Sequence, residues 1–238
     1  MNRLLDRLPS ARFLTTAPGR VNLLGEHVDY NGGVVLPAAI DRAVRLAAEP
    51  LDEPVVHLTA LDLDKSVSFD FQNLLERRDA AGKVLPSWAL YPAGVAWAAQ
   101  QNGLPLRGFR AVYSSDVPIG AGLSSSAAVE VAFGALWRAL GGWPVDNLQL
   151  AQLCKQAENE FVGVKSGLMD QFASANGVAG HALYFDTRSL DWRPIPFPPQ
   201  TVIVIADSGV RRSLATSAYN ERRAACEEAV EILKTVLP

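Results

Sequence analysis

The chain has 238 residues, of which 49% are hydrophobic and 20% are charged, and its formal net charge is -3. This composition is typical of a globular protein with a substantial core, and the scattered Lys and Arg residues argue against a nucleic-acid-binding surface. No run of 18 apolar residues occurs and the first residues lack the apolar core of a signal peptide, so we expect a cytoplasmic protein without a membrane segment. Cys154 and Cys226 have no CxxC partner, which favours two buried free thiols.

The first third of the sequence predicts β-strands, because short apolar or alternating runs are separated by turn residues. These runs cover residues 12–18, 20–25, 34–39, 43–49, 55–61 and 66–71. Asn31 and Gly32 lie between two of them, and both residue types favour the positive φ of a two-residue hairpin turn. We therefore expect a hairpin at this point.

The middle of the sequence is predicted to be mainly helical. A helix is expected over residues 88–101 and a strand over 108–116. Residues 127–140 are apolar nearly all round, which is typical of a buried helix. Asp146 followed by Gln149 predicts a capping box at the start of another helix that reaches about Phe161.

The last fifty residues begin with a proline-rich stretch, DWRPIPFPPQ over 191–200, which favours a connection between lobes. Residues 201–207, TVIVIAD, form a continuous apolar run that predicts a strand. A long helix is expected next. One face of it would carry Ala215, Ala218, Tyr219, Arg222, Cys226, Ala229 and Leu233.

The stretch PIGAGLSSSAAVEVA places two glycines and three serines at the start of the buried helix. A serine N-cap explains one serine, but it explains neither three serines nor Gly120 and Gly122. A helix N-terminus holds anions, and glycines let the backbone approach a phosphate. A Walker A loop is excluded because it needs a lysine, and the dinucleotide fingerprint lacks its third glycine. An anion site is the better interpretation.

A second group of polar residues lies in APGRVNLLGEHVDYNGG, which includes Arg20, Asn22, Glu26, His27 and Asp29. Charged groups this close to an apolar strand are costly unless they are paired or functional. Two interpretations remain open from the residues alone. The group is either a solvated loop before a turn or a set of acceptors for a polyhydroxylated ligand, since a carboxylate can bind two hydroxyls.

Two further carboxylates stand out by their position. Asp170 lies among Leu168, Met169 and Phe172 in KSGLMDQFASANG, so it is expected to be partly desolvated. It is either a helix cap or ion-pair partner, or a general base that accepts or orients a hydroxyl proton. Glu158 lies at the edge of an apolar stripe and is either an ordinary surface residue or a metal ligand.

Taken in order, the segments GRVNLLGEHVDYNGG, PIGAGLSSSAAVEVA and GLMDQ resemble the galactokinase family of the GHMP small-molecule kinases. The likeness also includes SGVRRSLATSAYNERR near the end. Val28 stands where threonine is usual, and Ser166 stands where many members have cysteine. The resemblance implies an α+β fold with two lobes. The first lobe, of the ribosomal S5 domain 2-like type, would span residues 1–195, and an incomplete start of the second would span 196–238, because the family continues into a C-terminal lobe with a third glycine-rich motif.

The resemblance also implies roles. Asp170 would be the catalytic aspartate, and Arg20 beside it would keep it ionised and stabilise charge on the transferred phosphoryl group. The implied contacts are, for the sugar, Glu26, His27, Asp29, Gly167 and Tyr219; for ATP, Gly120, Ala121, Gly122, Leu123, Ser124, Ser125 and Ser126; and for Mg²⁺, Ser126 and Glu158.

The activity implied is transfer of the γ-phosphoryl group of ATP to the C1 hydroxyl of galactose, with Mg²⁺ as cofactor and a monomeric protein. Three alternatives stay open. They are a kinase for a related sugar such as galacturonate or N-acetylgalactosamine, a non-catalytic galactose sensor, and an inactive fragment.

Overall fold

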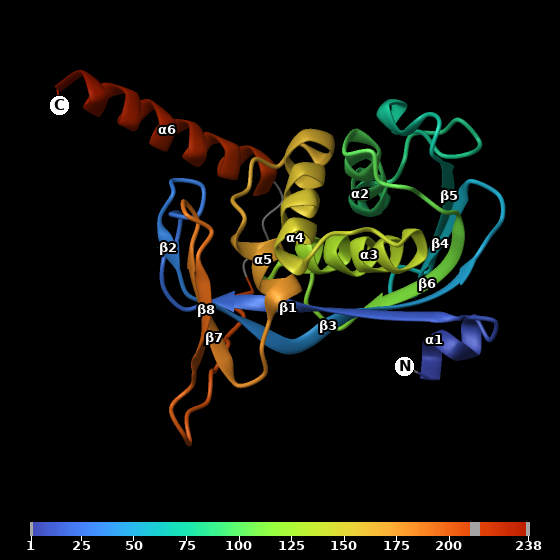
Figure 1. Cartoon of the computed structure of the whole chain (residues 1–238), viewed down its shortest axis with the longest axis horizontal. Helices are drawn as coiled ribbons and strands as arrows, with labels where there is room; N and C mark the ends of the chain where they lie inside the picture. The colour runs from blue at the N-terminus through green and yellow to red at the C-terminus, as the bar shows by residue number, and fades with distance from the viewer. Residues whose placement is uncertain (1, 210–214, 237–238) are drawn as a thin grey trace.

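The computed structural model of the chain describes residues 2–209 and 215–236, with the side chains of residues 3–209 and 220–236. Figure 1 shows a layer of helices over one face of a curved sheet, a second smaller sheet at one end, and a long last helix that projects from that end. This is the expected α+β arrangement.

The larger sheet carries the strands predicted from the first half of the sequence. Its strand order is β1-β3-β6-β4-β5, and its neighbours are antiparallel except for β4 and β6. Its strands are β1 (Phe13–Asn22), β3 (Pro37–Pro50), β4 (Val55–Ala60), β5 (Lys65–Asp70) and β6 (Phe109–Ser115). Strand β1 joins two of the predicted runs, with a register shift between Pro18 and Arg20.

The smaller sheet was only partly expected. It consists of β2 (Val34–Val35), β7 (His181–Asp186) and β8 (Trp192–Pro196), in the order β2-β7-β8. The prediction that 191–200 is purely a connection is therefore wrong, because its first half is a strand paired with β7. Proline lacks the N–H that an inner strand needs, and β8 avoids this cost because it lies at the edge of the sheet.

The helices expected over residues 88–101 and 127–140, after Asp146 and near the end of the chain lie close to their predicted positions, whereas those over residues 2–7 and 169–176 were not predicted. The helices are α1 (Asn2–Arg7), α2 (Leu90–Gln101), α3 (Ser125–Gly141), α4 (Asn147–Gln156), α5 (Met169–Asn176) and α6 (Ala215–Val236), with short 3-10 turns at Leu74–Glu76 and Ser87–Ala89. The capping box is confirmed, since the Asp146 side chain accepts from the Gln149 N–H and the Gln149 side chain accepts from the Asp146 N–H. Helix α4 continues into a π-helix over Ala157–Val162.

The main core lies between α3 and the larger sheet. The rings of Phe109, Phe133 and Trp137 pack together there, with centroids of Phe109 and Trp137 5.1 Å apart, and all three are fully buried. The Trp137 indole donates to the Arg107 carbonyl at 3.1 Å, so its one polar atom is satisfied. This burial explains why α3 is apolar nearly all round.

A second core joins α5 to the smaller sheet. Phe172 of α5 stacks on Phe185 of β7, with ring centroids 3.8 Å apart. Both side chains are fully buried, together with Val35 of β2. The smaller sheet is therefore fixed to the helical layer by this contact.

Residues 201–207 are not a strand, contrary to the prediction. Val202 and Val204 are 84% and 86% exposed, and Ile203 and Ile205 are 40% and 42% exposed. The alternation is that of an extended chain, but among the described residues no strand pairs with it. An apolar run becomes a strand only when a neighbouring backbone accepts and donates its hydrogen bonds.

The predicted hairpin is present in a looser form. Strands β1 and β3 pair up to Asn22 and Pro37, but a loop over residues 25–33 replaces the two-residue turn. Both cysteines are free, as expected, although Cys226 is only half-buried. None of the helices in the described part of the chain has an apolar stretch long enough to span a bilayer. The lobe boundary at residue 195 stays a prediction.

Candidate active site

The glycine–serine loop leads from β6 into α3 through three left-handed residues. Gly120, Gly122 and Ser124 have φ of 73°, 76° and 59°. Ser124 is the N-cap residue of α3, yet its side chain makes no cap hydrogen bond. Its hydroxyl instead donates to Asp170 Oδ2 at 2.5 Å. The interpretation of the serines as a plain helix cap is therefore wrong for Ser124, and the loop leaves the first N–H groups of α3 available to an anion.

Asp170 and Arg20 form the centre of the site. Arg20 contacts Asp170 Oδ1 through Nε at 2.7 Å and through Nη2 at 2.6 Å. Arg20 Nη1 also donates to the Gly122 carbonyl at 2.7 Å. The side chains of Arg20 and Asp170 are 13% and 27% exposed, so this ion pair is partly shielded from water. Residues 150 positions apart thus meet beside the glycine–serine loop.

The local fold brings β1 to this loop. A Cβ on Gly19 would lie 2.6 Å from the Leu123 carbonyl, and the Arg20 N–H donates to that same carbonyl at 3.1 Å. Glycine is needed here because the two backbones approach so closely. The register shift in β1 therefore serves to place Arg20 against the loop.

Ser126, in the first turn of α3, faces Glu158. The Ser126 hydroxyl donates to Glu158 Oε1 at 3.3 Å, and Ser166 donates to Glu158 Oε2. Glu158 is only 6% exposed, and burial raises the pKa of its carboxyl. The alternative that Glu158 is a surface residue is thus wrong.

Behind Glu158 lies a buried polar group that sequence reasoning missed. Gln171 Nε2 donates to Glu158 Oε2 at 2.9 Å and to Glu130 Oε2 at 3.0 Å. Glu130 is fully buried, which raises the pKa of its carboxyl well above the usual range, with a further contribution from the charge of Glu158. The available signal was Glu130 itself, a single carboxylate in an otherwise apolar helix.

Asp29 lies next to this centre. Burial, and then the negative charge of Asp170, raise the pKa of Asp29 to about 6. The Met169 N–H donates to the Asp29 carboxylate. Gly167 packs against it so closely that a Cβ there would overlap the carboxylate. The structure therefore brings together Asp29, Gly167 and Asp170.

Glu26 and His27 lie further out, with exposed side chains. Glu26 accepts from Asn22 Nδ2 at 2.9 Å, and His27 Nδ1 lies 2.7 Å from the Tyr30 hydroxyl. Tyr219 lies in α6, but its side chain falls outside the described residues.

The donor set of Ser126 and Glu158 suits Mg²⁺, which prefers oxygen ligands and is usually held by one or two protein groups together with phosphates. Hydroxyl and amide donors fix the orientation of both Glu158 oxygens. No group of three or more His, Cys, Asp and Glu side chains within the described ranges could hold a metal. A phosphate-linked Mg²⁺ site is consistent with both findings.

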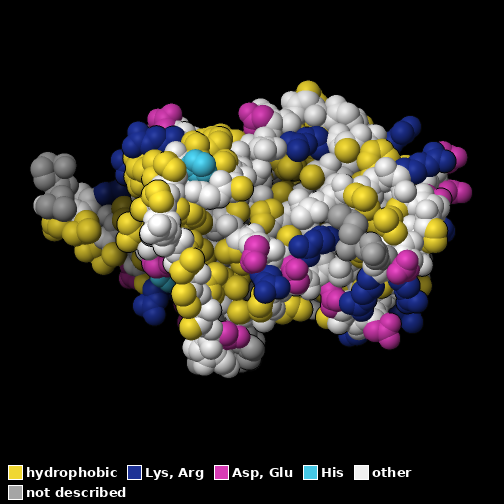
Figure 2. All heavy atoms as spheres, turned by 90° about the horizontal axis from the view of Figure 1, so that it is seen from below, with side chains coloured by type: hydrophobic (Ala, Val, Ile, Leu, Met, Phe, Trp, Pro, Cys, Tyr) yellow, Lys and Arg dark blue, Asp and Glu magenta, His cyan; other side chains and the backbone are white. Residues whose placement is uncertain are grey.

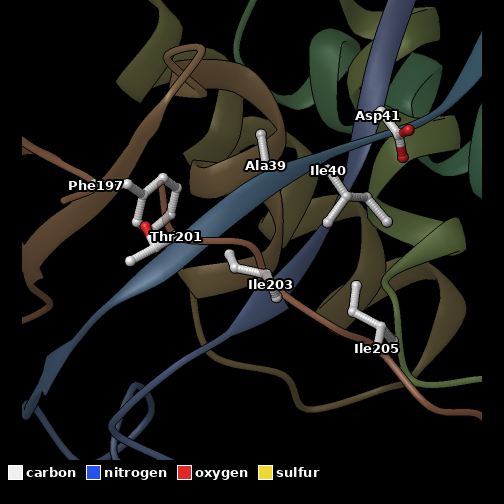
Figure 3. Close-up of a pocket in the computed structure, with 7 residues that line it drawn as sticks. All are labelled: Ala39, Ile40, Asp41, Phe197, Thr201, Ile203 and Ile205. Carbon is white, nitrogen blue, oxygen red and sulfur yellow. The ribbon is translucent and has the colours of Figure 1, made fainter. Parts of the chain in front are cut away.

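A cavity of about 290 Å³ lies away from these residues, between β3 and the segment 197–205 (Figure 3). It is lined by Ala39, Ile40, Asp41, Phe197, Thr201, Ile203 and Ile205. A neighbouring cavity shares Ala121 and Leu123 with the glycine–serine loop. Figure 2, which views the molecule from below, shows hydrophobic side chains gathered at the end that carries the smaller sheet, with charged side chains at both ends and between them. Neither cavity includes Asp29 or Asp170.

Two family profiles match the chain. The one described as the GHMP kinases N terminal domain matches residues 91–178, which include the glycine–serine loop and Asp170. The one described as the galactokinase galactose-binding signature matches residues 6–50, which include Arg20 and Asp29. The two matches thus cover both halves of the site.

Several known proteins are similar to the chain. The galactokinase of Chloroflexus aurantiacus is 47% identical over 226 residues, which are 94% of this chain and 56% of that protein. The galactokinase of Thermococcus kodakarensis is 42% identical, over 91% of this chain and 59% of that protein. The solved structure of Lactococcus lactis galactokinase complexed with galactose has a TM-score of 0.84 at 29% identity and covers 100% of this chain and 61% of that one. Mevalonate kinase of Methanococcus jannaschii, with a TM-score of 0.60 at 21% identity over 78% of this chain and 56% of that one, shares the fold.

The fold, with its glycine–serine loop at the start of a buried helix, is that of the GHMP kinases. Within that class, the chain belongs to the galactokinase family. It spans 56% to 61% of the length of the galactokinases named above.

Proposed function

We propose that the chain forms the catalytic and sugar-binding part of an ATP-dependent galactokinase, which transfers the γ-phosphoryl group of ATP to the C1 hydroxyl of galactose. The observation that carries this proposal is the position of the Asp170 carboxylate. It lies between Arg20 and Ser124, at the mouth of an anion-binding loop and beside Asp29.

Asp170 is suited to orient the hydroxyl nucleophile and accept its proton. Three donor contacts, two from Arg20 and one from Ser124, fix the orientation of both of its oxygens. A carboxylate held in one orientation is what a general base requires, because its geometry must match the reacting group.

The loop over residues 120–126 is suited to hold the phosphates of ATP. Phosphoryl transfer depends mainly on positioning and on stabilising charge around the transferred group. The N–H groups at the start of α3 and the Arg20 guanidinium supply positive potential on this side. Ser126 and Glu158 would hold Mg²⁺, which when bound neutralises charge on the phosphate oxygens.

The sugar would lie against Asp29, with Glu26, His27, Gly167 and Tyr219 as the further contacts. Asp29 and Asp170 are close enough for the charge of one to affect the other, so a hydroxylated ring held by Asp29 would present its neighbouring hydroxyl to Asp170. The absence of a side chain at Gly167 leaves the space that the Asp29 carboxylate occupies.

The test is coupled ADP release with galactose and Mg-ATP, comparing the chain with Asp170→Asn. The substitution is expected to lower turnover by at least about 100-fold, which is the range for removal of a general base. Binding of ADP should be unchanged, because Asp170 does not belong to the phosphate-binding N–H groups. Asp64→Asn is the matched control, since Asp64 is an exposed carboxylate in the turn between β4 and β5.

Near-normal turnover of Asp170→Asn would contradict the assignment of Asp170. Folded wild-type chain that binds galactose without releasing ADP would contradict catalysis by this chain. Faster turnover with galacturonate or N-acetylgalactosamine than with galactose would contradict the choice of sugar.

A further inference from the structure

Polar side chains of helix α6 contact residues 163–168, a segment that lies beside the candidate active site. Figure 1 shows the first turns of α6 beside the helical layer, near the connection that leads into α5. This connection covers residues 163–168, between the π-helix and α5. It has no helix or strand structure of its own. Backbone hydrogen bonds tie Gly163 and Val164 to the Glu158 carbonyl, and side-chain contacts add to these.

Asn220 of α6 bonds to this connection in both directions. The Lys165 N–H donates to Asn220 Oδ1 at 2.9 Å, and Asn220 Nδ2 donates to the Gly163 carbonyl at 3.1 Å. The amide thus pairs with the backbone as a neighbouring strand would. One turn further along α6, Arg223 Nη1 donates to the Lys165 carbonyl at 3.0 Å and to the Ser166 carbonyl at 3.5 Å.

The segment that α6 holds carries two contacts of the site. Ser166 donates to Glu158, the expected Mg²⁺ ligand. The next residue, Gly167, packs against Asp29, and the Met169 N–H donates to the Asp29 carboxylate. A shift of this backbone by an ångström would therefore move a partner of the metal carboxylate and a wall of the sugar pocket together.

The same helix also contacts the loop over residues 25–33. The Arg223 guanidinium lies 5.8 Å from the centre of the Tyr30 ring. Burial, and then the neighbouring Cys226 of α6, raise the pKa of Tyr30. Tyr30 in turn contacts His27. Arg223 thus touches both loops that surround Asp29.

We propose that Asn220 and Arg223 are positioning residues, and that α6 works as a clasp that fixes residues 163–167 and so sets the geometry around Asp29. This inference rests on the proposed function, because Asp29 is taken as a sugar ligand. The clasp acts on the sugar side of the site and, through Ser166, on Glu158. Among the α6 side chains that the structure describes, residues 220–236, none hydrogen-bonds to residues 120–126, so binding of Mg-free ADP is expected to stay unchanged.

The experiment compares wild-type chain with Asn220→Ala and with Glu228→Ala, an exposed residue of the same helix. Alanine has a higher intrinsic helix propensity than asparagine or glutamate, so neither substitution weakens α6 itself. A change in residues 163–168 in Asn220→Ala therefore comes from the lost side-chain hydrogen bonds. Amide hydrogen exchange is measured at Lys165 and Met169. Galactose and Mg-free ADP binding are measured by calorimetry.

In Asn220→Ala the Lys165 and Met169 amides should exchange faster, and the galactose dissociation constant should rise about tenfold, as expected for loss of two hydrogen bonds. ADP affinity should not change. Asn220→Asp keeps the acceptor for the Lys165 N–H and loses the donor to Gly163, so Lys165 should stay protected and the loss of galactose affinity should be smaller. If Asn220→Ala does not fold, the amide exchange and galactose affinity of Asn220→Asp test the proposal in its place.

The proposal is overturned if Asn220→Ala leaves amide exchange as it is in Glu228→Ala. It is also overturned if galactose affinity does not fall, or if galactose and ADP binding weaken equally, since both would then reflect general loosening. If wild-type chain binds no galactose, the proposed function fails instead, and the exchange of Lys165 and Met169 still decides whether the clasp exists.

Discussion

At the scale of single residues, Asp29 is the group whose protonation should be visible in solution. Its pKa is raised from 3.8 to about 6 in the folded chain. Between these values the folded state binds the proton more tightly than the unfolded state, so this group lowers stability as pH rises from about 4 to about 6. Over the same range the carboxylate forms, and galactose affinity should increase because the ionised form accepts hydrogen bonds from hydroxyls.

The substitution Asp29→Asn should remove the contribution of this group to both pH dependences. Urea midpoints at intervals between pH 4 and 7 would then fall less steeply with pH than in the wild type, and galactose affinity would be low at every pH. Asp64→Asn should keep the wild-type slopes. An unchanged slope in Asp29→Asn would mean that the pKa of Asp29 is not raised in the folded chain.

Gly167 gives a steric prediction at the same scale. In Gly167→Ala the new methyl group would overlap the Asp29 carboxylate, so we expect a loss of about 1–3 kcal/mol in stability, typical of overpacking, and loss of galactose binding. Chemical denaturation and calorimetry measure the two effects. The double variant Asp29→Ala, Gly167→Ala removes the overlapping carboxylate and should regain part of the stability. If the double variant is no more stable than Gly167→Ala, the methyl group does not clash with the Asp29 carboxylate.

The sequence allowed several of the clustered residues to be predicted, and the structure brings Arg20, Asp170 and the glycine–serine loop together. It did not indicate Gln171, which bridges Glu130 and Glu158. The reason is physical: a glutamine next to an aspartate on a helix is ordinary in sequence. Its importance depends on which carboxylates other elements bring within 3 Å of it.

At the scale of elements, local signals were sufficient where the hydrogen bonds are local. The capping box at Asp146 and Gln149 closes within four residues, and it was predicted correctly. The strand expected over residues 201–207 was wrong because a strand needs a partner, and an apolar run does not reveal whether one is present. The smaller sheet was not foreseen in full for the same reason.

The cap of α4 can be tested directly. Asp146→Ala should lower stability by about 1 kcal/mol, because the Gln149 N–H loses its acceptor at the start of the helix. Urea denaturation would show this as a lower midpoint with an unchanged slope. Asp191→Ala, at an exposed position outside any helix, is the control and should have little effect. Equal midpoints for the two variants would contradict the role of the cap.

At the scale of the whole molecule, the smaller sheet is coupled to the site. Val35 of β2 pairs with Phe185 of β7, and β2 directly follows the loop that carries Asp29. Phe185 in turn stacks on Phe172, three residues from the helix start that contains Asp170. The second core therefore links the loop over residues 25–33 to the helix that carries Asp170.

Phe185→Leu should lower stability and also weaken galactose binding, since the loop loses part of its support. Phe133→Leu in the main core should lower stability by a similar amount, on the order of 1–3 kcal/mol, while folded protein keeps its galactose affinity. Calorimetry well below both unfolding midpoints separates the two. Equal galactose affinity in both variants would mean that the smaller sheet does not support the loop.

The sequence by itself determined most helices and strands of the first two thirds, which follow from periodicity, caps and short segments in which neighbours along the chain interact. The class of fold and the expected chemistry followed from the resemblance of its motifs to a known family. Only the tertiary structure decided that Ser124 bonds to Asp170 rather than capping α3, that Glu158 is buried against Gln171, and that Asn220 holds the connection beside Asp29. Each of these contacts joins residues on different elements, 13 to 55 positions apart, so its existence depends on how those elements pack, which no local pattern specifies.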